Sequence, residues 1–270
     1  MLNVYYVRIK IRLPFTQFAQ SAPLFTLDEA RKLYNKDERN RSLLNLLDRL
    51  KRQGRVRQIA NGVYAGTFAT TPLNRYRVPA ALREDSVIAL HSALEFHGLA
   101  NQTFQTVYYF SARLRKEVVF DGVTYHSVVP PRPSLAPAHR LFQTERGADN
   151  VLLTGRERSF VDCLLFLDYS GGVEELDKSL AMFPSFDFEA ALAYLKLLRS
   201  PWLYSRLGFF LDRHADKLFF RGKARDQFLQ KLSRGVVYLT DKRPGQRWVP
   251  TWKLMVPEAI SPSRTSSVQT

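Results

Sequence analysis

The sequence contains a single cysteine, Cys163, and no long apolar run among its 270 residues. One cysteine can form neither an internal disulfide bond nor a multi-cysteine zinc site. No stretch approaches the roughly 18 apolar residues that cross a membrane, and charges interrupt the first residues, where a signal peptide needs an apolar core. We therefore expect a cytoplasmic protein that does not contact a membrane.

Acidic residues are also scarce: 25 Asp and Glu face 40 Lys and Arg, for a formal net charge of +15. Residues 1–83 hold 16 basic against 5 acidic residues, a net charge of +11, whereas residues 84–270 hold 24 against 20. A localised basic excess is typical of nucleic-acid-binding regions, because each neutralised phosphate releases counterions. Charge alone leaves two alternatives open, a solvated basic face and contact with an anionic surface.

Two amphipathic helices are predicted in this basic region. Thr26 and Glu29 have the spacing of a capping box, which predicts a short helix to about residue 35. A second helix is predicted for residues 40–53, and Gly54 ends it as a C-cap glycine does. On one side of this second helix leucine recurs, at Leu43, Leu44, Leu46, Leu47 and Leu50.

The opposite side of the second helix carries the side chains that could read DNA. Arg41, Asn45 and Arg49 are four residues apart and share one stripe. Arginine can bond bidentately to guanine and asparagine to adenine in the major groove, and serine can reach a phosphate or a base edge. The full set of candidate DNA-contacting residues is Arg39, Arg41, Ser42, Asn45, Arg49, Arg52, Arg55, Arg57 and Asn61.

A basic hairpin is predicted directly after this helix. Asn61-Gly62 is a strong hairpin-turn signal, and the strand before it carries Arg55 and Arg57. Helix, short turn, leucine-faced helix, glycine and basic hairpin follow one another as in a winged helix-turn-helix, with the second helix in the groove and the wing on flanking backbone. The alternative is a small helical module that holds a protein partner.

The flanks of this module are less informative. Residues 1–13 alternate apolar and basic side chains, as an edge strand or an N-terminal arm would, and we assign them no role. Phe15, Phe18 and Ala19 indicate a first helix that completes a three-helix core. Prolines and loose patterning between residues 68 and 84 place the domain boundary after residue 83.

The predicted fold class is α+β and mainly helical: a winged helix-turn-helix at 1–83, a larger mixed α/β domain at 84–260, and a flexible tail at 261–270. The helices predicted in the second domain cover residues 85–97, 156–168, 173–182, 188–198, 205–214 and 224–232. The predicted strands cover residues 106–111, 117–120, 123–129, 151–153, 236–239 and 252–256.

No catalytic, metal or cofactor site is predicted in the second domain. His91 and Ser92 are adjacent, so they point to different sides of a helix, and no glycine-flanked serine elbow occurs. His91 and His97 lack the spacing of a helical metal pair, and His97 is expected to cap the helix end. Cys163 falls in an apolar helical stretch and is expected to be a small core residue rather than a nucleophile.

The chain resembles the AbiEi family, the antitoxins of type IV toxin-antitoxin pairs linked to abortive phage infection. The resemblance extends from about Phe25 to Pro257 and rests on the order and spacing of several segments. These segments are the basic module ending in NGVY at 61–64, SALEFHGL at 92–99, RERSFVDCL at 156–164 followed by Gly171-Gly172, and RLGFFL at 206–211.

The resemblance implies a bifunctional repressor and antitoxin. The N-terminal domain would bind inverted repeats of double-stranded DNA in its own promoter. The C-terminal domain would counteract a cognate toxin of the nucleotidyltransferase fold, without a stable complex between the two proteins. Arg156, Arg158 and Asp162 would then form a polar surface used in antitoxicity; the alternative is helix-start electrostatics with a surface ion pair between Arg158 and Asp162.

Two further function classes remain open. One is a winged-helix transcription regulator whose second domain senses a ligand or dimerises, which would bind DNA but give no protection from a toxin. The other is a DNA-processing enzyme with a winged targeting domain, using acids such as Asp121 or Glu145. A magnesium-dependent activity lost on substitution of one of those acids would favour the enzyme.

Overall fold

A computed structural model describes residues 15–34, 40–131 and 144–260 of the chain. The chain divides into two compact units. The N-terminal unit comprises Met1–Glu84 together with Val118–Phe120, and the C-terminal unit comprises Asp85–Glu117 and Asp121–Thr270. This division lies one residue from the boundary predicted after residue 83. The predicted arm and tail, residues 1–13 and 261–270, lie outside the described residues.

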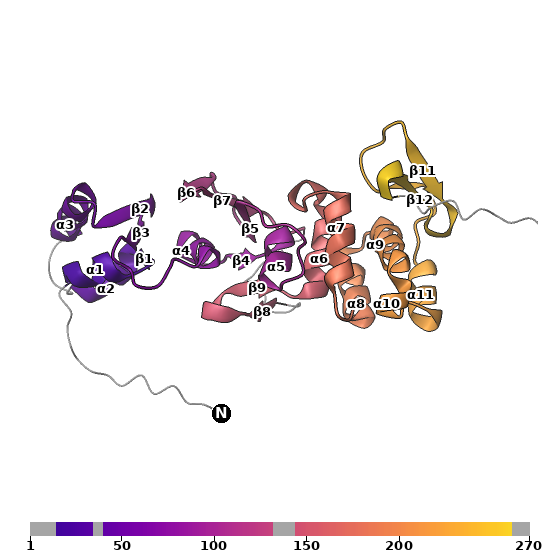
Figure 1. Cartoon of the computed structure of the whole chain (residues 1–270), viewed down its shortest axis with the longest axis horizontal. Helices are drawn as coiled ribbons and strands as arrows, with labels where there is room; N and C mark the ends of the chain where they lie inside the picture. The colour runs from indigo at the N-terminus through magenta and orange to yellow at the C-terminus, as the bar shows by residue number, and fades with distance from the viewer. Residues whose placement is uncertain (1–14, 35–39, 132–143, 261–270) are drawn as a thin grey trace, which may run out of the picture. The chain divides into compact units, whose positions relative to one another are not determined.

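Helices and short strands alternate in the N-terminal unit (Figure 1). Its elements are α1 (Phe15–Ser21), β1 (Phe25–Thr26), α2 (Leu27–Tyr34), α3 (Asn40–Arg52), β2 (Val56–Ala60), β3 (Val63–Gly66), η1 (Arg75–Arg77) and α4 (Val78–Leu82). The three strands form an antiparallel sheet in the order β1-β3-β2. The first helix and both helices of the basic region were predicted from the sequence, whereas β1 and α4 were not.

Local signals in the sequence explain where these helices begin and end. The Thr26 backbone N–H donates to Glu29 Oε2 at 2.7 Å, and the Glu29 N–H donates to Thr26 Oγ1 at 3.2 Å, which completes the predicted capping box. At the end of α3, Gly54 has a φ of +68°. The N–H groups of Gly54 and Arg55 bond to Lys51 O and Leu50 O, as in a Schellman motif.

One face of α3 packs into the core of this unit. Leu43, Leu47 and Leu50 are buried against aromatic side chains of the first two helices and the sheet. Phe25 connects the first helix to the sheet, because its ring contacts Phe18 of α1 and stacks on the ring of Tyr64 of β3. Leu44 was predicted on the buried leucine side, but it is 40% exposed, because the helical period places it away from the buried stripe.

The C-terminal unit combines a mixed sheet, a group of helices and a second small sheet (Figure 1). Up to the start of the helical group, the elements that follow α4 are β4 (Val87–Ile88), α5 (Leu90–Phe96), β5 (Thr106–Phe110), β6 (Val118–Phe120), β7 (Val123–Val128), β8 (Thr144–Arg146), η3 (Ala148–Asn150) and β9 (Leu152–Thr154). Of these strands, β6 belongs to the N-terminal unit, and within the C-terminal unit the strand order is β7-β5-β4-β9-β8. It mixes parallel pairs, β5 with β7 and β4 with β9, and antiparallel pairs, β4 with β5 and β8 with β9.

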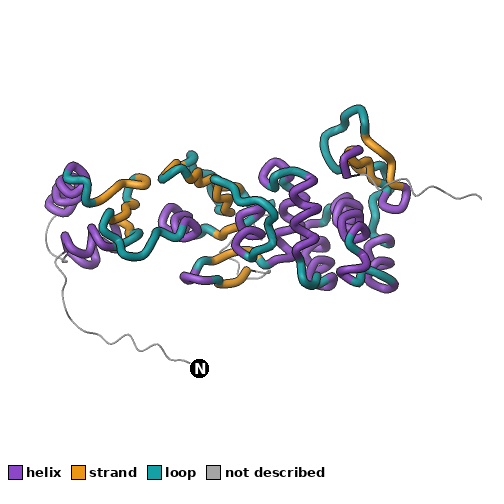
Figure 2. The backbone as a smooth tube through the Cα atoms, viewed as in Figure 1, coloured by secondary structure: helices purple, strands orange, loops and turns teal. Residues whose placement is uncertain are grey.

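Helices dominate the stretch that follows β9, and Figure 2 shows them as a nearly continuous series. They are α6 (Arg156–Leu165), η4 (Leu167–Tyr169), α7 (Val173–Met182), α8 (Phe188–Leu198), α9 (Pro201–Arg213), α10 (Ala215–Leu218) and α11 (Gly222–Leu229). The last described elements are β10 (Val237–Tyr238), β11 (Gln246–Val249), η5 (Pro250–Trp252), β12 (Leu254–Pro257) and η6 (Glu258–Ile260), with the sheet order β10-β12-β11. The described fold is thus mixed α/β with more helix than strand.

The predicted helix at 85–97 is wrong at its start. Val87 and Ile88 form β4, which lies between β5 and β9, and the helix begins only at Leu90, whose φ is +58°. A pair of apolar residues fits a helical period and a strand equally well, and the neighbouring strands decide between them. The predicted bounds 173–182 and 188–198, in contrast, coincide with α7 and α8.

A close contact joins the helices to the small C-terminal sheet. Gly208 of α9 lies so near the ring of Trp252 that a Cβ atom there would come within 2.1 Å of the ring. The indole Nε1–H donates to Asp212 one helical turn later, at 3.0 Å. Glycine at position 208 is therefore required by packing, since Trp252 occupies the space of a side chain.

Candidate functional site

The exposed face of α3 carries basic and amide side chains. Asn45, Arg49 and Arg52 are exposed, and Ser42 is half-buried. The side chains of Asn45 and Arg49 have no hydrogen bond or ion pair with another described residue. Of the other predicted contact residues, Arg41 lies in α3 with its side chain outside the description, and Arg39 lies outside the described residues. Of the predicted stripe of Arg41, Asn45 and Arg49, the second and third residues are thus exposed to solvent.

Two further side chains lie on the same face: Asp48, which was not among the predicted contact residues, and Leu44, which was predicted on the leucine side. Asp48 is exposed between Asn45 and Arg52, and its carboxylate pairs with Lys51 Nζ at 2.9 Å. Leu44 adds an apolar patch beside it. Helical spacing alone could have found both, because Asp48 is four residues from Leu44 and from Arg52. The face is therefore basic, with one acidic residue and one apolar residue included.

The hairpin β2-β3 adds further basic side chains, since Arg55, Arg57 and Asn61 are all exposed. Lys51 Nζ of α3 donates to Gln58 Oε1 of β2 at 2.9 Å, so the helix and the hairpin are tied to each other. Arg57, predicted as a DNA-contacting residue of the hairpin, also contacts an aromatic ring. Its guanidinium lies 4.7 Å from the centre of the Phe120 ring, which belongs to the same unit.

The cluster predicted as a polar surface in the C-terminal unit is not at the surface. Arg158 is 3% exposed and Asp162 is fully buried, so only Arg156 of the three reaches solvent. Their predicted pairing is confirmed, with Arg158 Nε 3.3 Å from Asp162 Oδ2. The expected surface ion pair is therefore an interior one, because α6 is covered by other elements on this side.

A third side chain completes this interior cluster. Tyr194 of α8 donates its hydroxyl to Asp162 Oδ1 at 2.5 Å. Burial raises the pKa of Asp162 to about 6, against the opposing effects of Arg158 and Tyr194. Since all three groups are buried and mutually bonded, the cluster joins α6 to α8 and has no accessible polar atom to offer a partner.

The two histidines singled out in the sequence have structural partners, and the cysteine lies in the core. His91 is buried, and its Nε2 lies 3.1 Å from Glu175 Oε1. His97 caps α5, and its Nε2 contacts Thr154 O at 2.8 Å. Cys163 is fully buried, and burial raises the pKa of its thiol well above the ordinary value, which fits the predicted core role. Among the described residues no group of three or more His, Cys, Asp and Glu side chains could hold a metal ion.

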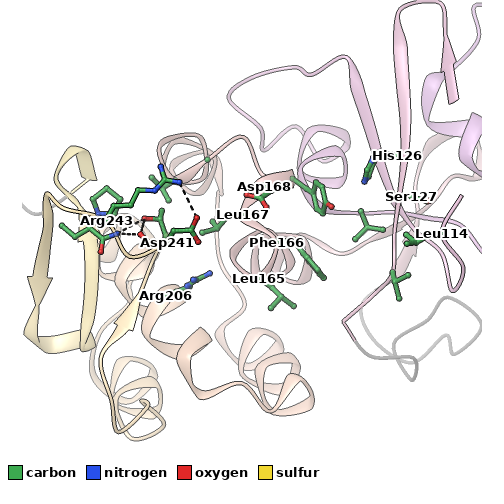
Figure 3. A pocket seen from close by; sticks show the side chains of 18 of the residues that line it. Leu114, His126, Ser127, Leu165, Phe166, Leu167, Asp168, Arg206, Asp241 and Arg243 are labelled. Carbon is green, nitrogen blue, oxygen red and sulfur yellow. Dashed lines mark hydrogen bonds and ion pairs between the residues drawn. The ribbon is translucent and has the colours of Figure 1, made fainter. Parts of the chain in front are cut away.

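A pocket of about 1110 Å³ lies within the C-terminal unit (Figure 3). It is bounded by the segment before β6, by β7, by the turn after α6, by α9 and by the loop between β10 and β11. Arg206 lines it from α9, Arg243 and Asp241 from the loop, and His126 from β7. Arg206 belongs to the RLGFFL segment at 206–211, but no role was predicted for it, because its partners come from distant parts of the chain.

In the parts of the chain that the structure describes, no helix is both long enough and apolar enough to span a bilayer. No family model matches the sequence, and no curated protein matches it. Among solved structures, the chain is similar to the crystal structure of the RV2827C protein from Mycobacterium tuberculosis, with a TM-score of 0.61 and 17% identity over 90% of this chain and 89% of that one. At this identity the likeness establishes a shared fold and nothing further.

Proposed function

We propose that the N-terminal unit is a winged helix-turn-helix that binds double-stranded DNA. The observation that carries this proposal is the element order α1-β1-α2-α3-β2-β3 with the sheet order β1-β3-β2, in which the exposed side of α3 is basic. In this arrangement α3 would enter the major groove, and the β2-β3 hairpin would lie along flanking phosphates.

The charge distribution supports DNA rather than a protein partner. The N-terminal 83 residues carry a net charge of +11, and the exposed Arg49 and Arg55 have no described carboxylate to neutralise them. A polyanion would supply the missing countercharge and would release its own counterions on binding. The single acid on the face, Asp48, is already paired with Lys51 and could accept from a cytosine amino group.

We further propose that the protein represses its own operon and acts as the antitoxin of a type IV toxin-antitoxin pair. This part rests on the resemblance to the AbiEi family described above. Its N-terminal unit would bind inverted repeats in the promoter, and its C-terminal unit would counteract a nucleotidyltransferase-like toxin. Since Arg158 and Asp162 are buried, we expect other, exposed residues of the C-terminal unit to provide the antitoxic activity.

The test of the repressor is a footprint and a salt-titrated gel shift with the full chain on DNA upstream of its gene. We expect protection of an inverted repeat, with a preference over random DNA that Asn45→Ala reduces and Lys196→Ala does not. Lys196 is an exposed basic residue of α8 and controls for the loss of one polar side chain. Equal binding to promoter and random DNA would contradict the proposal.

The antitoxin proposal is tested separately, in cells that express the neighbouring gene. Co-expression of the full chain should restore growth if that gene encodes the toxin, and a variant with Asn45→Ala should restore it equally well. Rescue that requires DNA binding would indicate repression of the toxin gene instead. Absence of rescue would leave a winged-helix regulator with a ligand-sensing domain, which the pocket of the C-terminal unit favours.

A further inference from the structure

The pocket of the C-terminal unit has the size and shape of a small-molecule site. Its volume of about 1110 Å³ slightly exceeds the range of about 300–1,000 Å³ that is usual for such sites. Figure 3 shows its two ends: Arg206, Asp241 and Arg243 lie at one, and His126 and Ser127 at the other, with the turn after α6 between them. A ligand that fills the pocket must therefore complement the charged side chains at one end and His126 and Ser127 at the other.

Arg206 is a rigid cation at the charged end. Its Nε and Nη2 donate to Tyr238 O at 3.1 and 2.8 Å, and its Nη1 donates to Leu164 O at 2.7 Å. The guanidinium also lies 4.5 Å from the centre of the Trp202 ring, so the group is fixed in position. These three bonds use three of its five N–H groups and leave two for a ligand.

The charge of Arg206 is poorly compensated. Burial lowers its pKa to about 10, and Asp241 opposes this shift only through space. All of its recorded hydrogen-bond partners in the described chain are backbone carbonyls. A half-buried cation without a bonded carboxylate is stabilised by an incoming anion, most strongly by one that accepts two parallel hydrogen bonds, such as a phosphate or a carboxylate.

Arg243 provides a second, accessible cation at the same end. Its side chain is 74% exposed, and its ion pair with Asp241, at 3.5 Å, joins two solvated groups. Exposed pairs of this kind contribute little, so an anion can replace Asp241 at small cost. The surrounding segment 231–253 holds six basic residues and one acidic residue, which adds a field that attracts anions.

The other end and the middle of the pocket present aromatic rings, whereas acceptor groups come from the charged end and from the turn after α6. Tyr169 lies with its ring 5.2 Å from that of His126 and 6.3 Å from that of Phe166, and all three line the cavity. Gln246 donates through Nε2 to Thr240 Oγ1 and to Asp241 O, which fixes the amide, and its buried Oε1 has no partner among the described residues. Asp168 adds an exposed carboxylate.

We propose that this pocket binds a nucleotide, with its phosphate on Arg206 and Arg243 and its base against the aromatic end. A nucleotide supplies each complement in one molecule: an anion for the arginines, a flat ring for the aromatic side chains, and hydroxyl or amino donors for Gln246 and Asp168. The proposal stands on the C-terminal unit alone and does not rest on the proposed DNA-binding function.

The test is calorimetric titration of the full chain with the 5′-monophosphates and triphosphates of adenosine, guanosine, cytidine and uridine. The matching nucleosides and inorganic phosphate serve as half-ligands. We expect at least one nucleotide to bind with a Kd below about 100 μM, and each of its halves at least about tenfold more weakly. Absence of nucleotide binding up to about 1 mM, or phosphate alone binding as tightly as the nucleotide, would overturn the proposal.

Two variants locate the site. Arg243→Glu should weaken nucleotide binding by at least about tenfold, because it reverses a charge at the phosphate end without removing a buried contact. Arg221→Glu is the matched control, since Arg221 is also exposed, pairs with a single exposed Asp216 and lies outside the pocket. Equal affinities of the two variants and the unaltered protein would place any bound nucleotide elsewhere. DNA binding measured on the same proteins distinguishes this failure from failure of the repressor proposal.

Discussion

The two units of the chain use arginine in opposite ways. In the N-terminal unit, Arg49 and Arg55 are exposed and have no described carboxylate partner. In the C-terminal unit, each of three arginines bonds to an aspartate: the pairs are Arg158 with Asp162, Arg213 with Asp177, and Arg225 with Asp212. The basic excess of the first unit is thus available to an external polyanion, whereas these three arginines of the second unit bond to carboxylates of its own helices.

The largest expected effect comes from breaking the interior pair. Asp162→Asn leaves Arg158 buried without a countercharge, which should lower the free energy of unfolding by about 3–5 kcal/mol. Urea unfolding followed by circular dichroism measures this loss. Asp168→Asn, a few residues further along in an exposed position, is the control and should change stability by less than about 0.5 kcal/mol. Similar losses in both variants would contradict the expectation that a buried charge pair contributes more to stability than a solvated charge does.

A packing change tests the join between α9 and the small sheet. Gly208→Ala forces a methyl group into the Trp252 ring and should cost about 2–3 kcal/mol. Gly235→Ala makes the same substitution where no atom lies within 4 Å, and it should leave the urea midpoint unchanged or slightly higher. If Gly208→Ala is as stable as Gly235→Ala, Trp252 does not occupy the position described.

The pair of Arg213 with Asp177 predicts a pH dependence. Burial alone would raise the pKa of Asp177, but hydrogen bonds from His214 and Arg213 outweigh it and hold the pKa well below its ordinary value near 4. Because the folded state favours the charged carboxylate, this stabilisation is present above about pH 4 and is lost as the pH falls further. Asp177→Asn should therefore be less stable than the unaltered protein by about 2 kcal/mol at neutral pH, with the gap closing in acid.

The control for this titration is Asp216→Asn, since Asp216 is 93% exposed and pairs with the solvated Arg221. Solvent screening makes such a pair nearly neutral for stability, so we expect no gap that changes with pH. Thermal melts at several pH values measure both variants. A gap for Asp177→Asn that widens in acid would reverse the sign derived above.

A smaller effect is expected on the exposed side of the comparison. Arg49→Ala should leave stability unchanged and reduce discrimination between the promoter repeat and random DNA by about 1–2 kcal/mol, if Arg49 contacts a base. Competition gel shifts at constant salt measure this ratio. If Arg49→Ala instead lowers stability and leaves discrimination between the two DNAs unchanged, Arg49 has a structural role, as the paired arginines of the C-terminal unit have.

The smallest effect is expected at the hairpin. Arg55→Ala should weaken binding to promoter and random DNA alike and reduce the slope of log affinity against log salt by about one. Arg57→Ala makes a useful contrast, because it also removes the contact with the Phe120 ring. A change in stability is therefore expected for Arg57→Ala and not for Arg55→Ala.

Much of the local structure could be predicted from the sequence because its signals are local. The capping box at Thr26, the C-cap at Gly54 and the periodicity of residues 173–198 each depend on residues a few positions apart. The strands β1 and β4 could not be found in this way. Each consists of only two residues and exists because a distant strand lies beside it.

The sites were less predictable for the same reason. The spacing of Arg158 and Asp162 predicted their pairing. It did not predict that Tyr194, 32 residues after Asp162, donates a hydrogen bond to the same carboxylate. The pocket is still less local, since Arg206, His126 and Gln246 come from three separate segments. A sequence pattern can therefore predict which faces of a helix differ, whereas burial of a charged face depends on the tertiary fold.

The contact of Gly208 with Trp252 also affects how the protein is made. The N-terminal unit comprises Met1–Glu84 and Val118–Phe120, so all of its residues leave the ribosome well before Trp252 and this unit can fold early during synthesis. Helix α9 lacks its packing partner Trp252 until residue 252 has left the ribosome. A chain released shortly before that point would carry a complete basic module attached to a helical unit with an open core, and we expect cellular proteases to remove it.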